Sequence, residues 1–179
     1  MSFKLPIGVA TIYKIPVVFI KINVADYMIL TTHALVGAAI GKNISNIWLI
    51  VILSTLSHFI LDHFRHGEYL TRKKFNGAFR KTIVDLTAGL LIIGMIAYFL
   101  KFSPTEIRNI IIGSIFGMLP DALTLIYWKS KIKILAPLYR FHIWAHKYPM
   151  DSPQRQWNIR NAINEIIISA AAIGLLAIS

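Results

Sequence analysis

Long apolar runs separated by short polar segments dominate this chain. A membrane-spanning helix needs about 20 mostly apolar residues, because the hydrocarbon core of a bilayer is roughly 30 Å thick. Three segments meet this requirement: Ile44–His63, Ile83–Phe102 and Ile107–Trp128. A fourth segment, Ile159–Ser179, is long enough but carries Arg160 near its start, and Met28–Gly41 is apolar but short. The pattern predicts an all-α, polytopic membrane bundle of four to six helices over residues 28–179.

The first 27 residues depart from this pattern. Lys14 and Lys21 interrupt the apolar stretch Ile7–Val24, and no clean small-residue cleavage site of a signal peptide follows it. We therefore predict that residues 1–27 form an amphipathic or interfacial N-terminal extension that precedes the bundle.

Composition favours a membrane protein. Hydrophobic residues make up 56% of the chain and charged residues only 15%, whereas soluble domains are roughly 45–50% apolar. The absence of cysteine excludes disulfide scaffolds and thiolate metal sites.

The basic residues predict an orientation in the membrane. A net charge of +11 would suggest a nucleic-acid partner in a soluble protein, but the cytoplasmic loops of membrane proteins also collect Lys and Arg. Here they concentrate in two long loops, Phe64–Thr82 and Lys129–Asn158, while the turn Ser103–Glu106 has none. We predict a multi-pass protein of the inner (cell) membrane with both long loops cytoplasmic, and we expect no nucleic-acid partner.

Two pairs of side chains have the spacing of metal ligands on a helix. The sequence HFILD places His58 four residues before Asp62, and HIWAH does the same for His142 and His146. Helical residues at this spacing have Cβ atoms about 5–6 Å apart, so both side chains can reach one ion. Either pair alone is explained equally well by interfacial histidines packing beside aromatic residues.

Acidic residues inside the predicted spans are a stronger signal. A carboxylate in the bilayer costs about 2.5–3.5 kcal/mol, so such acids usually pair or carry function. Asp85 and Asp121 are of this kind, although Asp121 after a helix break at Pro120, or Asp85 in a first turn, would also serve as a cap. Glu165 lies at the same depth and suits a neighbour of the ligands, an ion pair with Arg160 or a general base.

With the predicted orientation, these side chains and His33 gather at the cytoplasmic side of separate helices. The predicted metal ligands are His33, His58, Asp62, Asp121, His142 and His146. Asp85 or Glu165 is the expected further ligand or catalytic base. Imidazole and carboxylate without thiolate suit a divalent ion, with zinc expected first and Mn²⁺ or Fe²⁺ as alternatives. His63 and His66 follow the helix end, where they either extend to the interface or bind lipid phosphate, and His63 is interpreted as interfacial.

Four motifs resemble a known family. They are TTHALVGAAIG (31–41), LSHFILD (56–62), GMLPDAL (117–123) and HIWAH (142–146). They are similar to the inner-membrane metal-dependent hydrolases that are sometimes labelled LexA-binding, a family thought to be remotely related to zinc-dependent phospholipase C. The resemblance implies a membrane helical bundle and a metal-activated water that attacks an ester or phosphoester, with the six predicted ligands at the motif positions.

We therefore expect a membrane-embedded metal-dependent hydrolase of a phosphoester or ester, with a phospholipid as the expected substrate because the site would open at headgroup depth. Two alternatives stay open: a protein that binds or conducts a metal ion or proton, and a structural metal that joins the helices. Transport would call for polar residues toward the outer side, where Ile44–His63 and Ile83–Phe102 are apolar.

Overall fold

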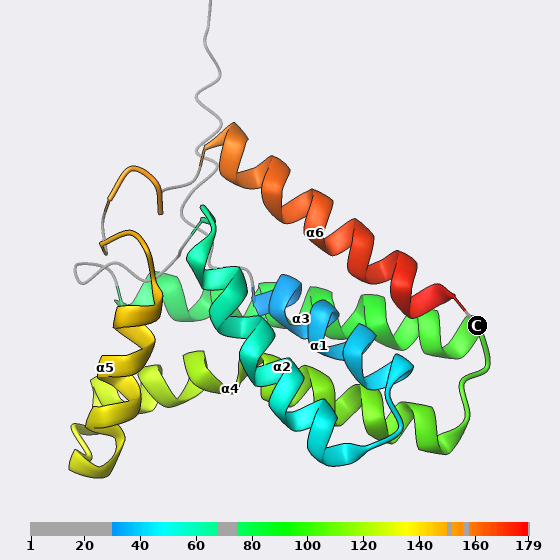
Figure 1. Ribbon diagram of the computed structural model, residues 1–179. Coiled ribbons are helices and arrows are strands. Elements are labelled where there is room, and N and C mark those ends of the chain that lie inside the picture. Colours follow the sequence, from blue (N-terminus) through cyan, green and yellow to red (C-terminus); the bar gives the residue numbers. More distant parts are fainter. Residues whose placement is uncertain (1–29, 68–74, 150–151, 156–157, 179) are drawn as a thin grey trace, which may run out of the picture.

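The computed structural model describes residues 30–67, 75–149, 152–155 and 158–178, with the side chains of 75–79 excepted. Its elements are α1 (Leu30–Asn43), α2 (Ile47–His63), α3 (Phe75–Phe99), α4 (Pro104–Ser130), the 3₁₀ turn η1 (Lys133–Leu135), α5 (Ala136–Ala145) and α6 (Ile159–Ala177) (Figure 1). These residues contain no strand, so the prediction of an all-α bundle is confirmed. The predicted extension, residues 1–27, lies outside the described residues.

Helix starts follow local capping. At the start of α2, the side-chain oxygen of Asn46 accepts hydrogen bonds from the backbone N–H groups of Trp48 (2.9 Å) and Leu49 (3.2 Å). At the start of α4, Ser103 and Glu106 form a reciprocal capping box. Such caps satisfy backbone donors that have no partner within the helix. The capped helices α2 and α4 start within three residues of the predicted starts at Ile44 and Ile107.

The two capping roles considered for Asp85 and Asp121 are both wrong, because neither residue lies at the start of its own helix. Helix α3 begins at Phe75, because Arg80 and Lys81 are good helix formers and extend the helix before its apolar part. Asp85 therefore lies beyond the first turn of its own helix. Helix α4 continues through Pro120, as membrane helices can when neighbouring helices satisfy the freed backbone groups, so Asp121 lies inside α4 and not at its start.

Helix α1 occupies the centre of the bundle and contacts α2, α3, α4 and α6 (Figure 1). Small residues allow this close packing: a Cβ atom on Gly37 would overlap the carbonyl oxygen of Gly113, and the reverse is also true. Ala34 and Ala38 are fully buried beside them. The 14 residues of α1 span about 21 Å, which is less than the thickness of a bilayer core.

The polarity of the bundle is that of a membrane protein. Trp48, Tyr98 and Phe99 are each more than 70% exposed, whereas His58 and Asp62 are at most 1% exposed. Three helices are long and apolar enough to cross a membrane, namely α3 from Arg80 onward, α4 and α6, and α2 is a shorter apolar helix. Apolar surface that would be costly in water is suited to lipid contact.

The helices run in alternating directions, with α2 and α4 toward α5 and α1, α3 and α6 away from it (Figure 1). Helix α5 lies beside the C-terminal ends of α2 and α4, and the α3–α4 turn and the C-terminal end of α6 lie at the opposite side of the molecule. We call the first side the α5 end. Because the ends of several helices lie at the α5 end, ligand-type residues from different helices come together there.

Candidate metal centre

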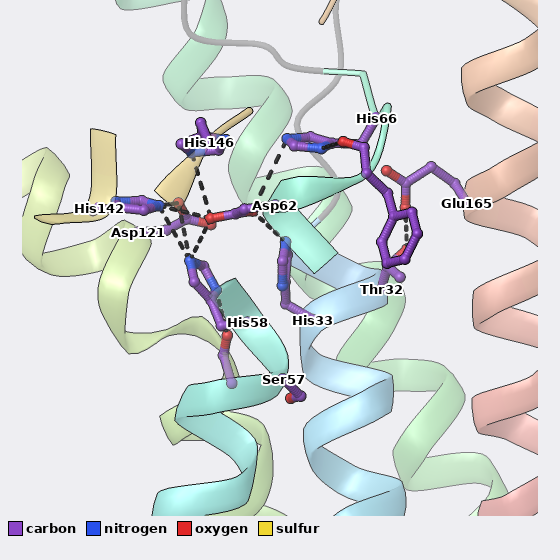
Figure 2. A network of polar contacts seen from close by, with 12 residues as sticks. Thr32, His33, Ser57, His58, Asp62, His66, Asp121, His142, His146 and Glu165 are labelled. Atoms are coloured by element: carbon purple, nitrogen blue, oxygen red, sulfur yellow. Dashed lines mark hydrogen bonds and ion pairs between the residues drawn. The ribbon is translucent and has the colours of Figure 1, made fainter. Parts of the chain in front are cut away.

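A buried cluster of five histidines and two aspartates lies at the α5 end (Figure 2). Its members are His33 of α1, His58 and Asp62 of α2, His66 just after α2, Asp121 of α4, His142 of α5, and His146 just after α5. Each is at most 8% exposed. We call these seven residues the histidine–aspartate cluster. The structure thus brings together all six predicted metal ligands and adds His66.

Asp62 stands at the centre of the cluster, and its Oδ2 atom faces the α5 side. His142 Nε2 lies 2.9 Å and His58 Nε2 lies 3.0 Å from this oxygen, and His146 Nε2 lies 3.4 Å away. Asp121 approaches the same imidazoles, with its Oδ1 atom 3.5 Å from His142 Nε2 and 3.9 Å from His58 Nε2. These atoms come from three helices and the residue after α5, so the tertiary fold, and not one local motif, builds the arrangement.

The other carboxylate oxygen of Asp62 faces different imidazoles. His33 Nε2 lies 3.4 Å and His66 Nε2 lies 4.0 Å from Oδ1. Helical spacing explains the placement of His58, Asp62 and His66, since each follows the previous one by four residues. The side chain of His66 lies on the same side as those of His58 and Asp62, although α2 ends at His63.

Two histidines have a defined tautomer because a backbone carbonyl accepts from the ring nitrogen that faces away from Asp62. His58 Nδ1 lies 2.8 Å from the Gly117 oxygen, and His66 Nδ1 lies 2.9 Å from the Phe64 oxygen. A carbonyl can only accept, so each Nδ1 carries the proton and donates it. In a neutral ring the Nε2 lone pair then faces a carboxylate, and either a proton on Nε2 or a metal ion between the two acceptors satisfies this arrangement.

His142 is oriented by a side chain instead of a backbone carbonyl. His142 Nδ1 lies 2.6 Å from the Thr124 hydroxyl oxygen, one turn after Asp121 on α4. Histidine ligands in metal sites usually have their second ring nitrogen fixed in this way, which orients the ring and raises its basicity as a ligand.

The donor atoms lie close enough together to share a small divalent ion. Zn–N and Zn–O bonds of about 2.0–2.2 Å at tetrahedral angles place ligand atoms about 3.3–3.6 Å apart. His58 Nε2 and His142 Nε2 are 3.2 Å apart and lie 3.0 and 2.9 Å from Asp62 Oδ2, so small side-chain movements would give the spacing of zinc ligands. Three groups of ligand atoms lie within 4.8 Å of one another: His33, His58 and Asp121; His58, Asp62 and His142; Asp62, His66 and His146. The residues present therefore fit a divalent metal ion.

Asp85 and Glu165, the predicted further ligand or base, make their hydrogen bonds to threonines of α1. Asp85 Oδ2 accepts from the Thr31 N–H (3.1 Å), and its Oδ1 accepts from the Thr31 hydroxyl (2.8 Å), so Asp85 caps α1 from the neighbouring helix α3. Glu165 Oε2 accepts from the Thr32 hydroxyl at 2.7 Å. Figure 2 shows Glu165 on the side of the cluster opposite to His142. A role of either acid as ligand or base stays a prediction.

The sequence analysis does not place His66 or Thr124 at the site. His66, expected at the interface or on lipid phosphate, is 7% exposed, and its eight-residue spacing from His58 through Asp62 is the signal that indicates it. Gly117 belongs to the motif GMLPDAL, but its contact with His58 and that of Thr124 with His142 join residues distant in sequence.

An apolar cavity of about 330 Å³ reaches the cluster at Asp121. Its walls come from α1, α3 and α4, and its apolar lining includes Leu30, Ile83, Leu86, Ile115, Met118 and Leu125. Thr82 and Asp121 are the polar residues of its lining, and the side-chain oxygens of both are themselves buried. The cavity is therefore an apolar volume directly beside the candidate metal centre.

Comparisons of the chain with protein-family models, with curated proteins and with solved structures found no match. The resemblance of the four motifs to inner-membrane metal-dependent hydrolases stays a prediction. The function is therefore inferred from the histidine–aspartate cluster and the cavity beside it.

Proposed function

We propose that this protein is a membrane-embedded, metal-dependent hydrolase that cleaves a phosphoester or ester bond of a lipid at the cytoplasmic leaflet of the inner membrane. The observation that carries the proposal is the convergence of imidazoles from α1, α2 and α5 on Asp62, next to an apolar cavity that has Asp121 in its wall. The motif resemblance points to the same activity.

The chain would hold the ion through His58, Asp62 and His142, whose donor atoms lie closest together, with Asp121 beside the position left open for water. A bound divalent ion supplies Lewis acidity and lowers the pKa of a coordinated water to about 7. Gly117 orients His58 through its carbonyl oxygen. Burial of the cluster keeps bulk water away and strengthens every charge interaction within it.

The cavity supports a lipid as the substrate. An acyl chain would lie against Ile83, Leu86 and Met118, and the scissile bond would then be near Asp121. A volume of 330 Å³ is within the usual range of about 300–1,000 Å³ for small-molecule sites. The cytoplasmic leaflet follows from the positive-inside rule, because α5 and its basic neighbours are at the same end as the cluster.

Two features disfavour the alternatives. Away from the cluster, the α1–α4 contact is closed by Gly37 against Gly113 and by Gly41 against Asn109, and the cavity between α1, α2 and α6 is lined mainly by apolar side chains, which disfavours a path for an ion. A purely structural metal needs a closed coordination shell, whereas Asp121 borders a cavity large enough for a ligand.

The test combines elemental analysis with substrate screening on the purified full chain in detergent. We expect bound metal, together with hydrolysis of a phospholipid or another lipid phosphoester or ester. Asp62→Asn should lose both the metal and turnover, because the central carboxylate is gone. The matched control is His63→Ala, which alters an exposed histidine beside Asp62 and should retain both. Full activity of Asp62→Asn, or a metal-free wild-type protein with turnover, would reject the proposal.

A further inference from the structure

We infer that Asp62 bridges two metal positions, the second of which is formed by Asp62, His66 and His146. This inference rests on the metal-binding part of the proposed function and deepens it. It adds His66, which none of the four motifs contains, to the ligands.

The two oxygens of Asp62 face different sets of imidazoles. Oδ2 lies 2.9 Å from His142 Nε2, 3.0 Å from His58 Nε2 and 3.4 Å from His146 Nε2, whereas Oδ1 lies 3.4 Å from His33 Nε2 and 4.0 Å from His66 Nε2. The Asp62 side chain is fully buried. A carboxylate with imidazole nitrogens beside both oxygens can be shared by two ions, and His146 then approaches the second ion from the Oδ2 side.

The cluster also has more ligands than one ion uses. A catalytic zinc site has three protein ligands and an open position for water, and His58, His142 and Asp62 already supply three. Asp121 adjoins them, and His33, His66 and His146 lie at the same depth, all at most 8% exposed. The cluster therefore contains enough ligand-type side chains for a second ion.

His66 has the orientation of a ligand. Its Nδ1 donates to the Phe64 carbonyl oxygen at 2.9 Å, so in the neutral ring Nε2 presents its lone pair toward Asp62, as in His58. The ring centroid lies 5.5 Å from that of His146, and one ligand atom each of Asp62, His66 and His146 lie within 4.8 Å of one another. These three residues form the second position (Figure 2).

Charge balance narrows the substrate class. Asp62 and Asp121 offset the charge of one divalent ion, so a second ion leaves positive charge for an anionic substrate to offset. Paired metal ions act on phosphoryl groups by stabilising the attacking and leaving oxygens together. The inference therefore favours a phosphoester over an uncharged carboxylic ester.

The metal content of the full chain in detergent tests the inference directly. After loading with Zn²⁺ and removal of free ion, elemental analysis should give two zinc ions per wild-type chain and one per His66→Ala chain. His63→Ala, an exposed histidine three residues earlier, should keep two. One zinc ion in both the wild type and His66→Ala would overturn the second position and leave the proposed function intact. No zinc in the wild type would overturn both.

A titration of the metal-free wild type with Co²⁺ does not depend on the folding of any variant. Its absorption should saturate at two equivalents, and its electron paramagnetic resonance should show coupling between the two ions. Saturation at one equivalent, with the spectrum of an isolated ion, would contradict the inference.

Discussion

The carbonyl of Gly117 shows how a single backbone group can define a ligand. The Gly117 oxygen, three residues before Pro120 in α4, accepts a hydrogen bond from His58 Nδ1 at 2.8 Å. A Cβ atom at Gly117 would also lie 2.6 Å from the His33 oxygen. Gly117 therefore fixes the ring of His58 and lets α1 approach α4 beside the cluster.

Thr124 allows a prediction about ligand orientation. Thr124→Val keeps the shape of the side chain but removes the hydroxyl that lies 2.6 Å from His142 Nδ1. We expect metal affinity to fall about 10- to 100-fold, as for other residues that orient a ligand, and competition with a chelator measures this. Thr87→Val, which removes a hydroxyl that donates to the Ile83 carbonyl on α3, is the matched control. Equal affinities of the two variants would show that Thr124 does not support the site.

The spacing of single residues made much of the cluster predictable. His58 and Asp62 are visible in the sequence because helical geometry turns a four-residue interval into a shared face. The contact of Thr31 with Asp85 joins residues 54 positions apart, and no local pattern indicates it. For the same reason, no local pattern predicts the contacts of Thr124 and Gly117, because the histidines that they contact lie on other helices.

The α1–α4 pair is where helix packing supports the site. Gly37 and Gly113 face each other with no room for a side chain, and Ser114 donates to the Ala34 carbonyl oxygen at 3.2 Å. Small residues at such interfaces allow backbone contact and stronger dispersion attraction. This packing brings His33 of α1 and Asp121 of α4 to the same depth.

Gly113→Ala should therefore destabilise the bundle. The added methyl group would overlap the Gly37 carbonyl oxygen, and overpacking of this kind costs about 1–3 kcal/mol. The thermal unfolding midpoint in detergent should fall, and metal binding should weaken with it. Gly94→Ala is the control, because a Cβ atom there meets nothing within 4 Å and Ala is the better helix former. A midpoint for Gly113→Ala equal to that of Gly94→Ala would contradict this account of the interface.

Hydropathy located the helices but not their arrangement. The predicted segments correspond to α1, α2, α3, α4 and α6 because apolar runs of bilayer length are distinctive. Helix α5 was expected only through the spacing of His142 and His146, since its segment is short and basic. The central position of α1 depends on which helices carry small residues, and a hydropathy profile does not contain that information.

The bundle as a whole places an apolar cavity between membrane-facing helices and beside the cluster, and this arrangement gives a test of substrate access. Leu86→Trp should fill the cavity at its α3 wall. Displacing an acyl chain whose contacts contribute about 1–3 kcal/mol should slow hydrolysis of a long-chain lipid phosphoester about tenfold or more. Hydrolysis of a short-chain, water-soluble analogue and the metal content should stay unchanged.

Leu90→Trp provides the control for that measurement, because Leu90 is 49% exposed one turn further along α3 and does not line the cavity. It should leave the ratio of long-chain to short-chain rates unchanged. If Leu86→Trp slowed both substrates equally, the cavity would not be the site of the acyl chain.

The central position of a 14-residue helix also has a consequence for biosynthesis. Helix α1 emerges from the ribosome before the helices that contact it, yet its described part has only 14 residues and carries His33 and two threonines in its first turn. Such a segment inserts poorly by itself, so it settles only once α4 and α6 have been made. Helix α1 is thus made before its neighbours but seated after them, and the ligands cannot come together before His146 has been synthesised.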